Sequence, residues 1–504
     1  MFELWLGAII SVFTLTNILA ILCGVLFGIF TGALPGLSST MALAIIIPFT
    51  FSMDPATGLI LLGAVYSASV YAGSISAILL NTPGTPSAAA TVLDGYEMTK
   101  KGLSARALGL SAIASGFGGI VSVILLSTVA PFLALQSLRF GPPEYFALAV
   151  FGLTIISSLA GKNPYKGLLA GALGIFLATV GMDPILGYPR FTFGSSVLVE
   201  GFTLIPVLIG LFSASQAFSL MISSKSSKGS TSPKDSDIPN VSGNILPKFK
   251  ELLRLSPNMG RSSIIGTSIG IIPGVGTDPA AFIAYNEAKR WSKEKDQFGK
   301  GSDHGLVAPE ASNNAVTGGS LIPLLSLGIP GNAVSAVFLG GLLIHGLRPG
   351  AELFVHSGNI VYALFFSLFI ANILVIVIGI AGARAFSKVL VVKPIVLGPI
   401  ILILSIVGSY AIHNNYYDIW IMLAFGLLGF MLRRYGFPLA PIVLALILGP
   451  KAETSLSQSM LISQNDWTIF FTRPLSAILL VIAVITFITP FIRDINKNKN
   501  KKVA

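Results

Sequence analysis

Four Pro-Gly dipeptides inside or beside apolar stretches are the positions of this sequence best suited to bind a small charged solute. Proline removes a backbone donor and glycine permits a positive φ, so together they stop a helix. The free N–H groups at the next helix start favour an anion, and the free carbonyl groups at the preceding helix end can hold a cation. The four dipeptides are Pro35-Gly36, Pro83-Gly84, Pro273-Gly274 and Pro330-Gly331.

Small polar residues surround each Pro-Gly break. Ser, Thr and Asn can cap a helix start while offering a hydroxyl or amide group to a bound carboxylate. The flanking residues are Ser38, Ser39 and Thr40 at the first break, Asn81, Thr82 and Thr85 at the second, Gly276 and Thr277 at the third, and Asn332 at the fourth. They can also be ordinary caps and kinks in helix packing, where Gly, Pro and Ser are common. The symmetric set of four breaks favours a carboxylate-binding site.

Ionisable and amide residues near the third and fourth breaks extend this candidate site. Glu310, Asn313 and Asn314 lie at the start of an apolar segment, and Asp278 follows the third break. Because ionisable groups at membrane depth are costly and often functional, Asp278 and Glu310 are candidates for a coupling ion, Na⁺ or H⁺. The two asparagines can donate to a substrate carboxylate. The alternatives are helix-start positions for the two acids and interhelical hydrogen bonds for the asparagines.

The composition requires a membrane protein. Of 504 residues, 53% are hydrophobic and only 11% are charged, whereas a soluble domain has about 25% charged residues. We therefore predict an all-α polytopic membrane protein without a soluble domain between its spans. The predicted apolar segments are 17–34, 38–53, 58–80, 107–131, 143–160, 167–181, 201–222, 261–275, 277–289, 313–329, 331–345, 356–383, 394–412, 416–432, 436–449 and 474–492.

Basic residues between the apolar segments predict the orientation. A stretch rich in Ser, Lys, Pro and Asp is typical of a flexible linker, and the C-terminal tail is rich in Lys and Asn. Both are expected on the cytoplasmic side of a bacterial inner membrane, so the net charge of +11 indicates orientation and no nucleic-acid partner. The predicted parts are a first transmembrane repeat at 1–222, a cytoplasmic linker at 223–258, a second transmembrane repeat at 259–493 and a cytoplasmic tail at 494–504.

Two blocks of sequence recur in the same order. Gly28-x-x-x-Gly32-x-x-Pro35-Gly36 recurs as Gly266-x-x-x-Gly270-x-x-Pro273-Gly274, and Asn81-Thr82-Pro83-Gly84 recurs as Gly328-Ile329-Pro330-Gly331. Counting spans between basic clusters places Lys101 inside and its counterpart Arg348 outside. Equivalent positions on opposite faces predict two inverted-topology repeats, with broken helices or re-entrant hairpins at the Pro-Gly loops.

The longer blocks around these breaks resemble the large membrane permease subunit of tripartite tricarboxylate transporters, the TctA family. The most specific blocks run from Tyr71 to Gly84 and from Pro309 to Gly331, and shorter ones run from Gly32 to Leu37 and from Gly270 to Gly276. The resemblance covers essentially the full chain. It implies a small membrane subunit of about four spans and a periplasmic solute-binding protein as partners.

The resemblance also implies secondary active uptake of tricarboxylates or related carboxylates such as citrate, coupled to a Na⁺ or H⁺ gradient by alternating access. No cofactor other than the coupling ion is expected. One alternative is an uncoupled carboxylate facilitator or channel. Another is an intramembrane enzyme using Asp278, His304 or Glu310, but the sequence contains no nucleophile–base pair and no metal-binding motif. We therefore expect a transporter and not an enzyme.

Overall fold

The computed structural model describes residues 2–154, 163–183, 185–226, 241–274, 276–389 and 394–503. Three predicted features extend outside the described residues: the end of the apolar segment 143–160, residues 227–240 of the linker 223–258, and Val275 after the third break. The predicted all-α class is confirmed, because the described strands are only β1 (Gly181–Met182) and β2 (Pro189–Arg190), which pair antiparallel.

The described helices before the linker are α1 (Phe2–Val12), α2 (Leu15–Ala33), α3 (Ser39–Thr50), α4 (Pro55–Leu80), η1 (Pro86–Ala88), α5 (Ala89–Lys100), α6 (Ser104–Ser137), α7 (Pro142–Thr154), α9 (Pro164–Ala178), η2 (Ser196–Leu198), α10 (Leu204–Leu208), the π-helix η3 (Ile209–Ala214) and α11 (Ser215–Ser226). The later helices are α12 (Phe249–Ile271), α13 (Thr277–Trp291), η5 (Lys295–Gln297), α14 (Asp303–Leu327), α15 (Ala333–Ile344), α16 (Ala351–His356), α17 (Gly358–Ala381), α18 (Ala383–Val389), α19 (Pro394–His413), α20 (Tyr416–Arg434), α21 (Ala440–Ile462), α22 (Ile469–Thr472) and α23 (Pro474–Val503).

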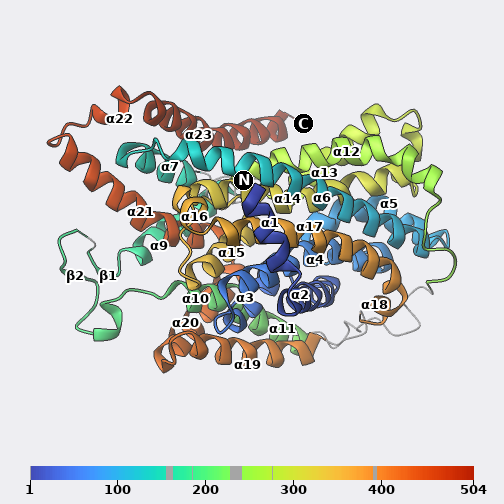
Figure 1. Ribbon diagram of the computed structural model, residues 1–504, viewed down its shortest axis with the longest axis horizontal. Helices are drawn as coiled ribbons and strands as arrows, with labels where there is room; N and C mark the ends of the chain where they lie inside the picture. The colour runs from blue at the N-terminus through green and yellow to red at the C-terminus, as the bar shows by residue number, and fades with distance from the viewer. Residues whose placement is uncertain are drawn as a thin grey trace. The chain divides into compact units, whose positions relative to one another are not determined.

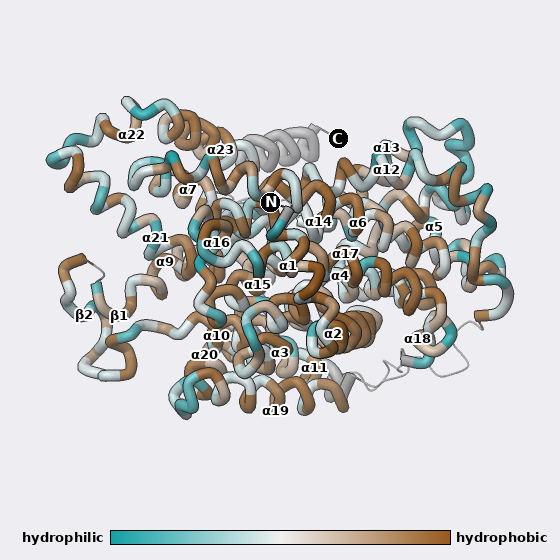
Figure 2. The backbone as a smooth tube through the Cα atoms, in the orientation of Figure 1, coloured by the Kyte–Doolittle hydropathy of each residue, from teal (hydrophilic) through white to brown (hydrophobic). Residues whose placement is uncertain are grey.

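Several of these helices can cross a membrane. Seven have the length and apolar composition of a span among the described residues, and others are shorter apolar helices. Helices α2 and α19 consist mostly of hydrophobic residues, whereas hydrophilic residues gather at the turn between α13 and α14 (Figure 2). The structure thus supports a multi-pass membrane protein.

The chain forms two compact units, and each combines two segments that are far apart in the sequence. Unit 1 comprises Met1–Ala134 and Gln216–Ile412. Unit 2 comprises Leu135–Ser215 and His413–Ala504. The chain therefore crosses between the units three times, and all four Pro-Gly breaks belong to unit 1.

Helices α4 and α14 form the core of unit 1. Helix α4 is buried from Thr57 to Leu79, and α14 is buried from Gly305 to Ser326. Helix α2 packs along α4 and α12 packs along α14 (Figure 1). Helix α17 covers another side of α4. The two buried helices thus each have one long neighbour that ends in a Pro-Gly break.

The two core helices end in the same way. Helix α4 begins after Asp54, whose carboxylate accepts a hydrogen bond from the Ala56 N–H at 2.9 Å, and it ends at Asn81 with a φ of 57°. Helix α14 begins after Ser302, whose hydroxyl caps Gly305 at 3.3 Å, and it ends at Gly328 with a φ of 74°. Asn and Gly are the residues that adopt this left-handed cap most readily. Asn81 and Gly328 are equivalent positions of the recurring sequence block.

Unit 2 is built around α21, which packs against α7 and α9, while α23 packs on α7 and α20 packs on the π-helix η3. Arg190 joins the β-hairpin to α21 through Glu453 at 2.5 Å. Arg473 pairs with the buried Glu144 of α7 at 3.2 Å. These ion pairs fix the loops of unit 2 to its helices.

Several helices are longer than their predicted apolar segments, and α12 and α21 are two examples. Helix α12 begins at Phe249, so the last part of the stretch expected to be a linker is helical. Helix α21 continues to Ile462, although its apolar segment ends near residue 449. In both cases the added turns are polar or amphipathic, and apolar periodicity alone does not reveal them.

Candidate functional site

The recurring glycines allow equivalent helix pairs to approach closely. A Cβ on Gly28 would lie 2.8 Å from the Val65 carbonyl oxygen of α4, and a Cβ on Gly266 would lie 2.2 Å from the Ser312 carbonyl oxygen of α14. A Cβ on Gly270 would likewise lie close to the Val316 carbonyl oxygen. The α2/α4 and α12/α14 pairs therefore pack in the same register through glycines at equivalent positions.

The four breaks form two pairs. A Cβ on Gly84 would lie 2.6 Å from the Gly32 carbonyl oxygen, and a Cβ on Gly331 would lie 2.6 Å from the Gly270 carbonyl oxygen. The Gly274 N–H also donates to the Gly331 carbonyl at 2.8 Å. The first break therefore lies against the second, and the third lies against the fourth.

Contacts also connect the two pairs. Helix α13, which follows the third break, contacts η1 after the second break, and α15, which follows the fourth break, contacts α3 after the first. The Tyr66 hydroxyl of α4 lies 2.9 Å from the Ser320 hydroxyl of α14 and accepts a hydrogen bond from Asn332 at 2.9 Å. The structure thus gathers all four predicted breaks within unit 1.

The first and second breaks combine exposed turns with buried helix starts. At the first break Pro35 and Ser38 are half-buried, Gly36 is exposed with a φ of 93°, and Ser39 and Thr40 are buried. At the second break Asn81, Thr82 and Pro83 are exposed, while Gly84 and Thr85 are buried. Ser38 caps α3 by accepting from the Met41 N–H at 3.4 Å. The turns of both breaks are therefore exposed at the protein surface.

The third and fourth breaks are more enclosed. Pro273, Gly274, Pro330, Gly331 and Asn332 are buried, and Gly276, Thr277 and Asp278 are half-buried. Asn332 caps α15 by accepting from the Ser335 N–H at 2.8 Å. The Asn332 side chain therefore caps a helix start, which is the alternative to carboxylate binding that the sequence analysis gave.

Asn313 and Asn314 lie in the buried middle of α14. Asn314 donates to the Ser115 carbonyl at 3.0 Å and to the Asn372 side-chain oxygen at 3.4 Å, so it makes the interhelical bonds expected as an alternative. The side-chain oxygens of Asn313 and Asn314 are buried and have no hydrogen-bond partner among the described residues. Since buried acceptors without a partner are costly, these two oxygens are distinctive features of the core.

A cage of four hydroxyl groups surrounds Glu310. Ser74 donates to Glu310 Oε1 at 2.5 Å, and Thr91 donates to the same oxygen. Ser111 and Ser115 donate to Oε2 at 2.8 Å each. Glu310 is 0% exposed. The donors come from α4, α5 and α6, so the carboxyl group of α14 joins four helices of unit 1.

This hydroxyl cage can support either protonation state of Glu310. No salt bridge reaches Glu310 among the described residues, and a buried charge without a cationic partner is strongly disfavoured. Four donors stabilise the carboxylate, while a rotated hydroxyl can accept from the protonated acid. The group is therefore suited to bind and release a proton or to take part in an oxygen-lined cation site.

The structure separates the two coupling-ion candidates. Asp278 lies in the first turn of α13, where it accepts from the Thr277 hydroxyl at 3.1 Å. No hydrogen bond joins it to Glu310 or to the hydroxyl cage in the part of the chain described. Its position fits the helix-start alternative.

The cage hydroxyls are functional candidates that the sequence prediction missed. Ser111 and Ser115 are four residues apart and thus lie on one face of α6, which is a signal visible in the sequence. Ser74 belongs to a buried helix whose other serines include Ser67, and the Ser67 hydroxyl donates to Asn372 at 2.8 Å. Serines repeated at helical spacing in an apolar span therefore mark the polar interior of unit 1.

Asp94 is a second buried carboxylate, and it holds the turn between α13 and α14. Its Oδ1 accepts from the N–H groups of Gly299, Gly301 and Ser302 at 2.9, 2.8 and 2.7 Å. Its Oδ2 accepts from the Tyr285 hydroxyl at 3.0 Å. Because every bond fixes backbone or a buried ring, Asp94 is a positioning residue for this turn.

Comparison with known proteins relates the chain to a transporter family. Residues 18–444 match the family described as "Tripartite tricarboxylate transporter TctA family". An "uncharacterized 52.8 kDa protein in TAR-I ttuC' 3'region" of Agrobacterium vitis is 35% identical over 488 residues, covering 97% of this chain and 96% of that protein. An "uncharacterized protein in TAR-II ttuC' 3'region" of the same organism is 35% identical over 232 residues, covering 45% of this chain and 96% of that protein. No solved structure matches.

Proposed function

The chain belongs to the tripartite tricarboxylate transporter TctA family, and from this premise we propose that it carries citrate-like carboxylates inward across a bacterial inner membrane. The observation that carries the proposal is the family match over residues 18–444, which includes all four breaks. Membership implies partner subunits. We propose a small membrane subunit and a periplasmic solute-binding protein that delivers the substrate.

The substrate site is proposed at the two pairs of Pro-Gly breaks. Helices α3 and α13 begin after the first and third breaks, and their free N–H groups favour a carboxylate. The exposure of the turn at Asn81 and Thr82 supports solute access to the second break. The enclosed third and fourth breaks, with Asn313 and Asn314 in the middle of α14, are proposed to form the interior of the same site.

Coupling is proposed at Glu310. A buried carboxyl group in a hydroxyl cage exchanges a proton or binds Na⁺ only when water reaches it, so its occupancy can change with the conformation of unit 1. Family membership and the absence of a nucleophile–base motif in the sequence favour transport over catalysis. Asp278 stays a secondary coupling candidate at the third break.

Alternating access is proposed to occur through movement of unit 1 against unit 2. The three chain crossings lie beside irregular helix: Pro131 precedes the first inside α6, the π-helix η3 precedes the second, and Asn414 with a φ of 52° follows α19 at the third. Proline and π-helical turns are common sites of bending. The contacts of equivalent glycines support two repeats in unit 1, and we propose that these repeats are inverted.

The test is uptake of labelled citrate and other di- and tricarboxylates into proteoliposomes that contain the chain, its small subunit and the binding protein. We expect uptake that requires the binding protein and an imposed Na⁺ or proton gradient. Uptake that needs neither would identify an uncoupled facilitator. No uptake of any carboxylate would refute the proposed substrate class.

A further inference from the structure

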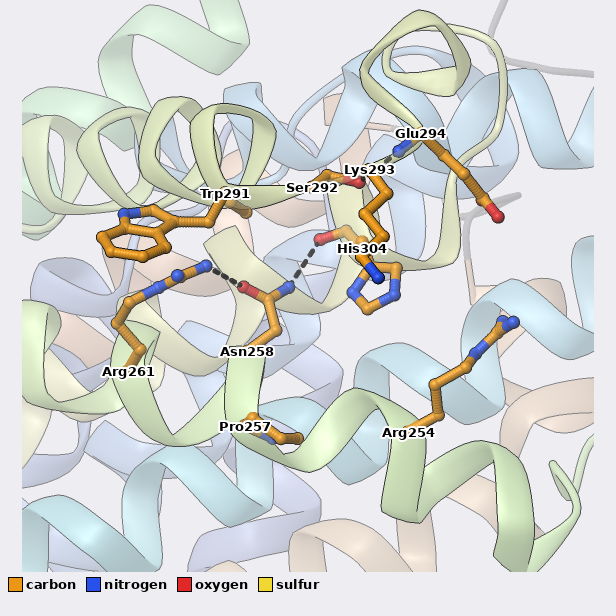
Figure 3. A pocket seen from close by; sticks show the side chains of 10 residues that line it. Arg254, Pro257, Asn258, Arg261, Trp291, Ser292, Lys293, Glu294 and His304 are labelled. Carbon is orange, nitrogen blue, oxygen red and sulfur yellow. Dashed lines mark hydrogen bonds between the residues drawn. The ribbon is translucent and has the colours of Figure 1, made fainter.

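A basic pocket lies in unit 1 between α12, the end of α13 and the start of α14. Its volume is about 370 Å³. Helix α12 contributes Arg254, Asn258 and Arg261, which lie on one helix face because they are four and three residues apart. Trp291 at the end of α13, Lys293 in the following turn and His304 at the start of α14 complete the pocket (Figure 3).

Arg261 is held in position within the pocket. Its guanidinium donates to the Asn258 side-chain oxygen at 3.1 Å and lies 5.5 Å from the centre of the Trp291 ring. Asn258 in turn donates to the His304 carbonyl at 3.1 Å (Figure 3). The Arg261 Nε is buried and has no hydrogen-bond partner among the described residues. The pocket thus contains an oriented guanidinium group whose Nε–H donor has no acceptor among the described residues.

Positive charge exceeds negative charge in the pocket. The lining contains three basic side chains, Arg254, Arg261 and Lys293, and one acidic side chain, Glu294. Asp303 lies 3.9 Å from Arg254, but Asp303 already pairs with Arg106 at 2.7 Å. Burial lowers the pKa of His304, so His304 contributes as a neutral hydrogen-bonding group near pH 7. The pocket therefore suits an anion with several oxygens, such as a phosphate group.

An apolar stripe of α12 lies next to this basic face. Phe249 is 74% exposed, Leu253 is 56% exposed and Ile264 is 58% exposed, and their spacing places them along one side of α12. Trp291 at the pocket rim is 67% exposed. Exposed tryptophan at a helix end is typical of the membrane interface. An anionic phosphate with acyl chains fits this combination better than a free ion does.

We propose that this pocket binds the phosphate headgroup of an anionic phospholipid, with its acyl chains along the α12 stripe. Basic pockets between membrane helices commonly bind such headgroups. Asp94 fixes the turn that carries Lys293, so the pocket is formed before the lipid arrives. The bound lipid then links the first half of α12, the end of α13 and the start of α14, at the side away from the third break.

The test measures thermal stability of the full-length protein in detergent after addition of phosphatidylglycerol, phosphatidylcholine with the same acyl chains, or inorganic phosphate. We expect phosphatidylglycerol to raise the apparent Tm by several degrees. The increase should fall at least about threefold in Lys293→Gln and in Arg261→Gln. Lys295→Gln removes an exposed charge from the same turn outside the pocket and should keep the full increase.

Three results would overturn the proposal. Equal stabilisation by both lipids would mean that the headgroup is not recognised. Stabilisation by inorganic phosphate alone would identify a soluble anion in place of a lipid. An unchanged lipid response in Lys293→Gln, whose exposed side chain can be changed without disturbing the fold, and in Arg261→Gln would mean that the pocket is not the site.

Discussion

At the scale of single residues, the described part of unit 1 contains two buried carboxylates with different surroundings. Four side-chain hydroxyls hold Glu310, whereas backbone N–H groups hold Asp94. Hydroxyls rotate and can exchange donor and acceptor roles, while backbone N–H groups can only donate. Glu310 is therefore suited to a change of protonation or ion occupancy, and Asp94 is suited to a fixed structural role.

Replacement of Glu310 should separate coupling from folding. Glu310→Gln keeps the shape of the side chain and an acceptor for the hydroxyls but removes the ionisable group. We expect gradient-driven uptake to fall at least about tenfold while the folded protein is still obtained. Initial uptake rates in proteoliposomes, with and without a gradient, measure this. Glu97→Gln, which removes a surface ion pair with Lys100, is the matched control, and equal loss in both variants would contradict a coupling role.

Replacement of Asp94 should loosen the turn between α13 and α14. Asp94→Ala leaves three backbone donors and the Tyr285 hydroxyl without their acceptor, which we expect to destabilise the protein by about 2–4 kcal/mol. Thermal unfolding in detergent and limited proteolysis of the turn measure this. Asp296→Asn, at an exposed position of the same turn, should have little effect. Unchanged proteolysis of Asp94→Ala would show that other contacts hold the turn.

At the scale of elements, glycine contacts determine how the broken helices meet. Gly84 and Gly331 each face a carbonyl oxygen of the partner break, and neither has a positive φ. Their requirement for glycine is therefore one of space and not of backbone conformation. The same steric limit acts at both positions.

Alanine at either position should separate the paired breaks. We expect Gly84→Ala and Gly331→Ala each to lower stability by about 1–3 kcal/mol, because the added methyl group would lie near 2.6 Å from a carbonyl oxygen. Thermal unfolding of the purified variants tests this. Gly260→Ala is the control, since nothing lies within 4 Å of its new Cβ. Similar stability of all three variants would refute close packing at the breaks.

The hairpin loop of unit 2 should respond to acid. N–H groups of Leu186 and Ile185, together with Arg190, lower the pKa of Asp183 below its usual value. A lowered pKa in the folded state means that this stabilisation is present above the ordinary aspartate pKa and is lost as the pH falls through the folded value. We expect the loop to stay protected from protease at pH 5–7 and to open at lower pH. Asp183→Asn should abolish that pH dependence.

At the scale of the whole molecule, the orientation of the repeats is the main structural prediction. Lys101 and Arg348 occupy matching places after the second and fourth breaks. An inverted repeat places them on opposite sides of the membrane, whereas a parallel repeat places them on the same side. Each unit combines two segments that are far apart in the sequence, and this is compatible with both an inverted and a parallel repeat.

Cysteine labelling tests this orientation. In a Cys23→Ser background, Lys101→Cys should react with a membrane-impermeant maleimide only after the inner face is exposed, and Arg348→Cys should react in intact cells. Cys23 is replaced so that each variant carries a single cysteine, because it is the one cysteine of the sequence and is exposed in α2. Labelling of both new cysteines from one side would exclude the inverted arrangement.

The sequence reveals local signals better than distant contacts. It predicts the all-α membrane class and the four breaks, because Pro-Gly and apolar composition act within a few residues. It does not reveal the cage around Glu310, because Ser74 and Ser115 lie 236 and 195 residues from their partner. It also does not show that unit 1 combines segments from both halves. The substrate-site assignment and the inverted orientation stay predictions.

The sequence distance between Glu310 and its cage has a consequence for biosynthesis. Ser74, Thr91, Ser111 and Ser115 leave the ribosome about 200 residues before Glu310 does. Until then, these hydroxyls lack their carboxylate acceptor and can bond to nearby backbone carbonyls instead. Unit 1 cannot close before its second segment, which ends at Ile412, has been synthesised. The polar core of unit 1 is therefore incomplete while only the first half of the chain has been synthesised. The insertion of α14 completes this polar core.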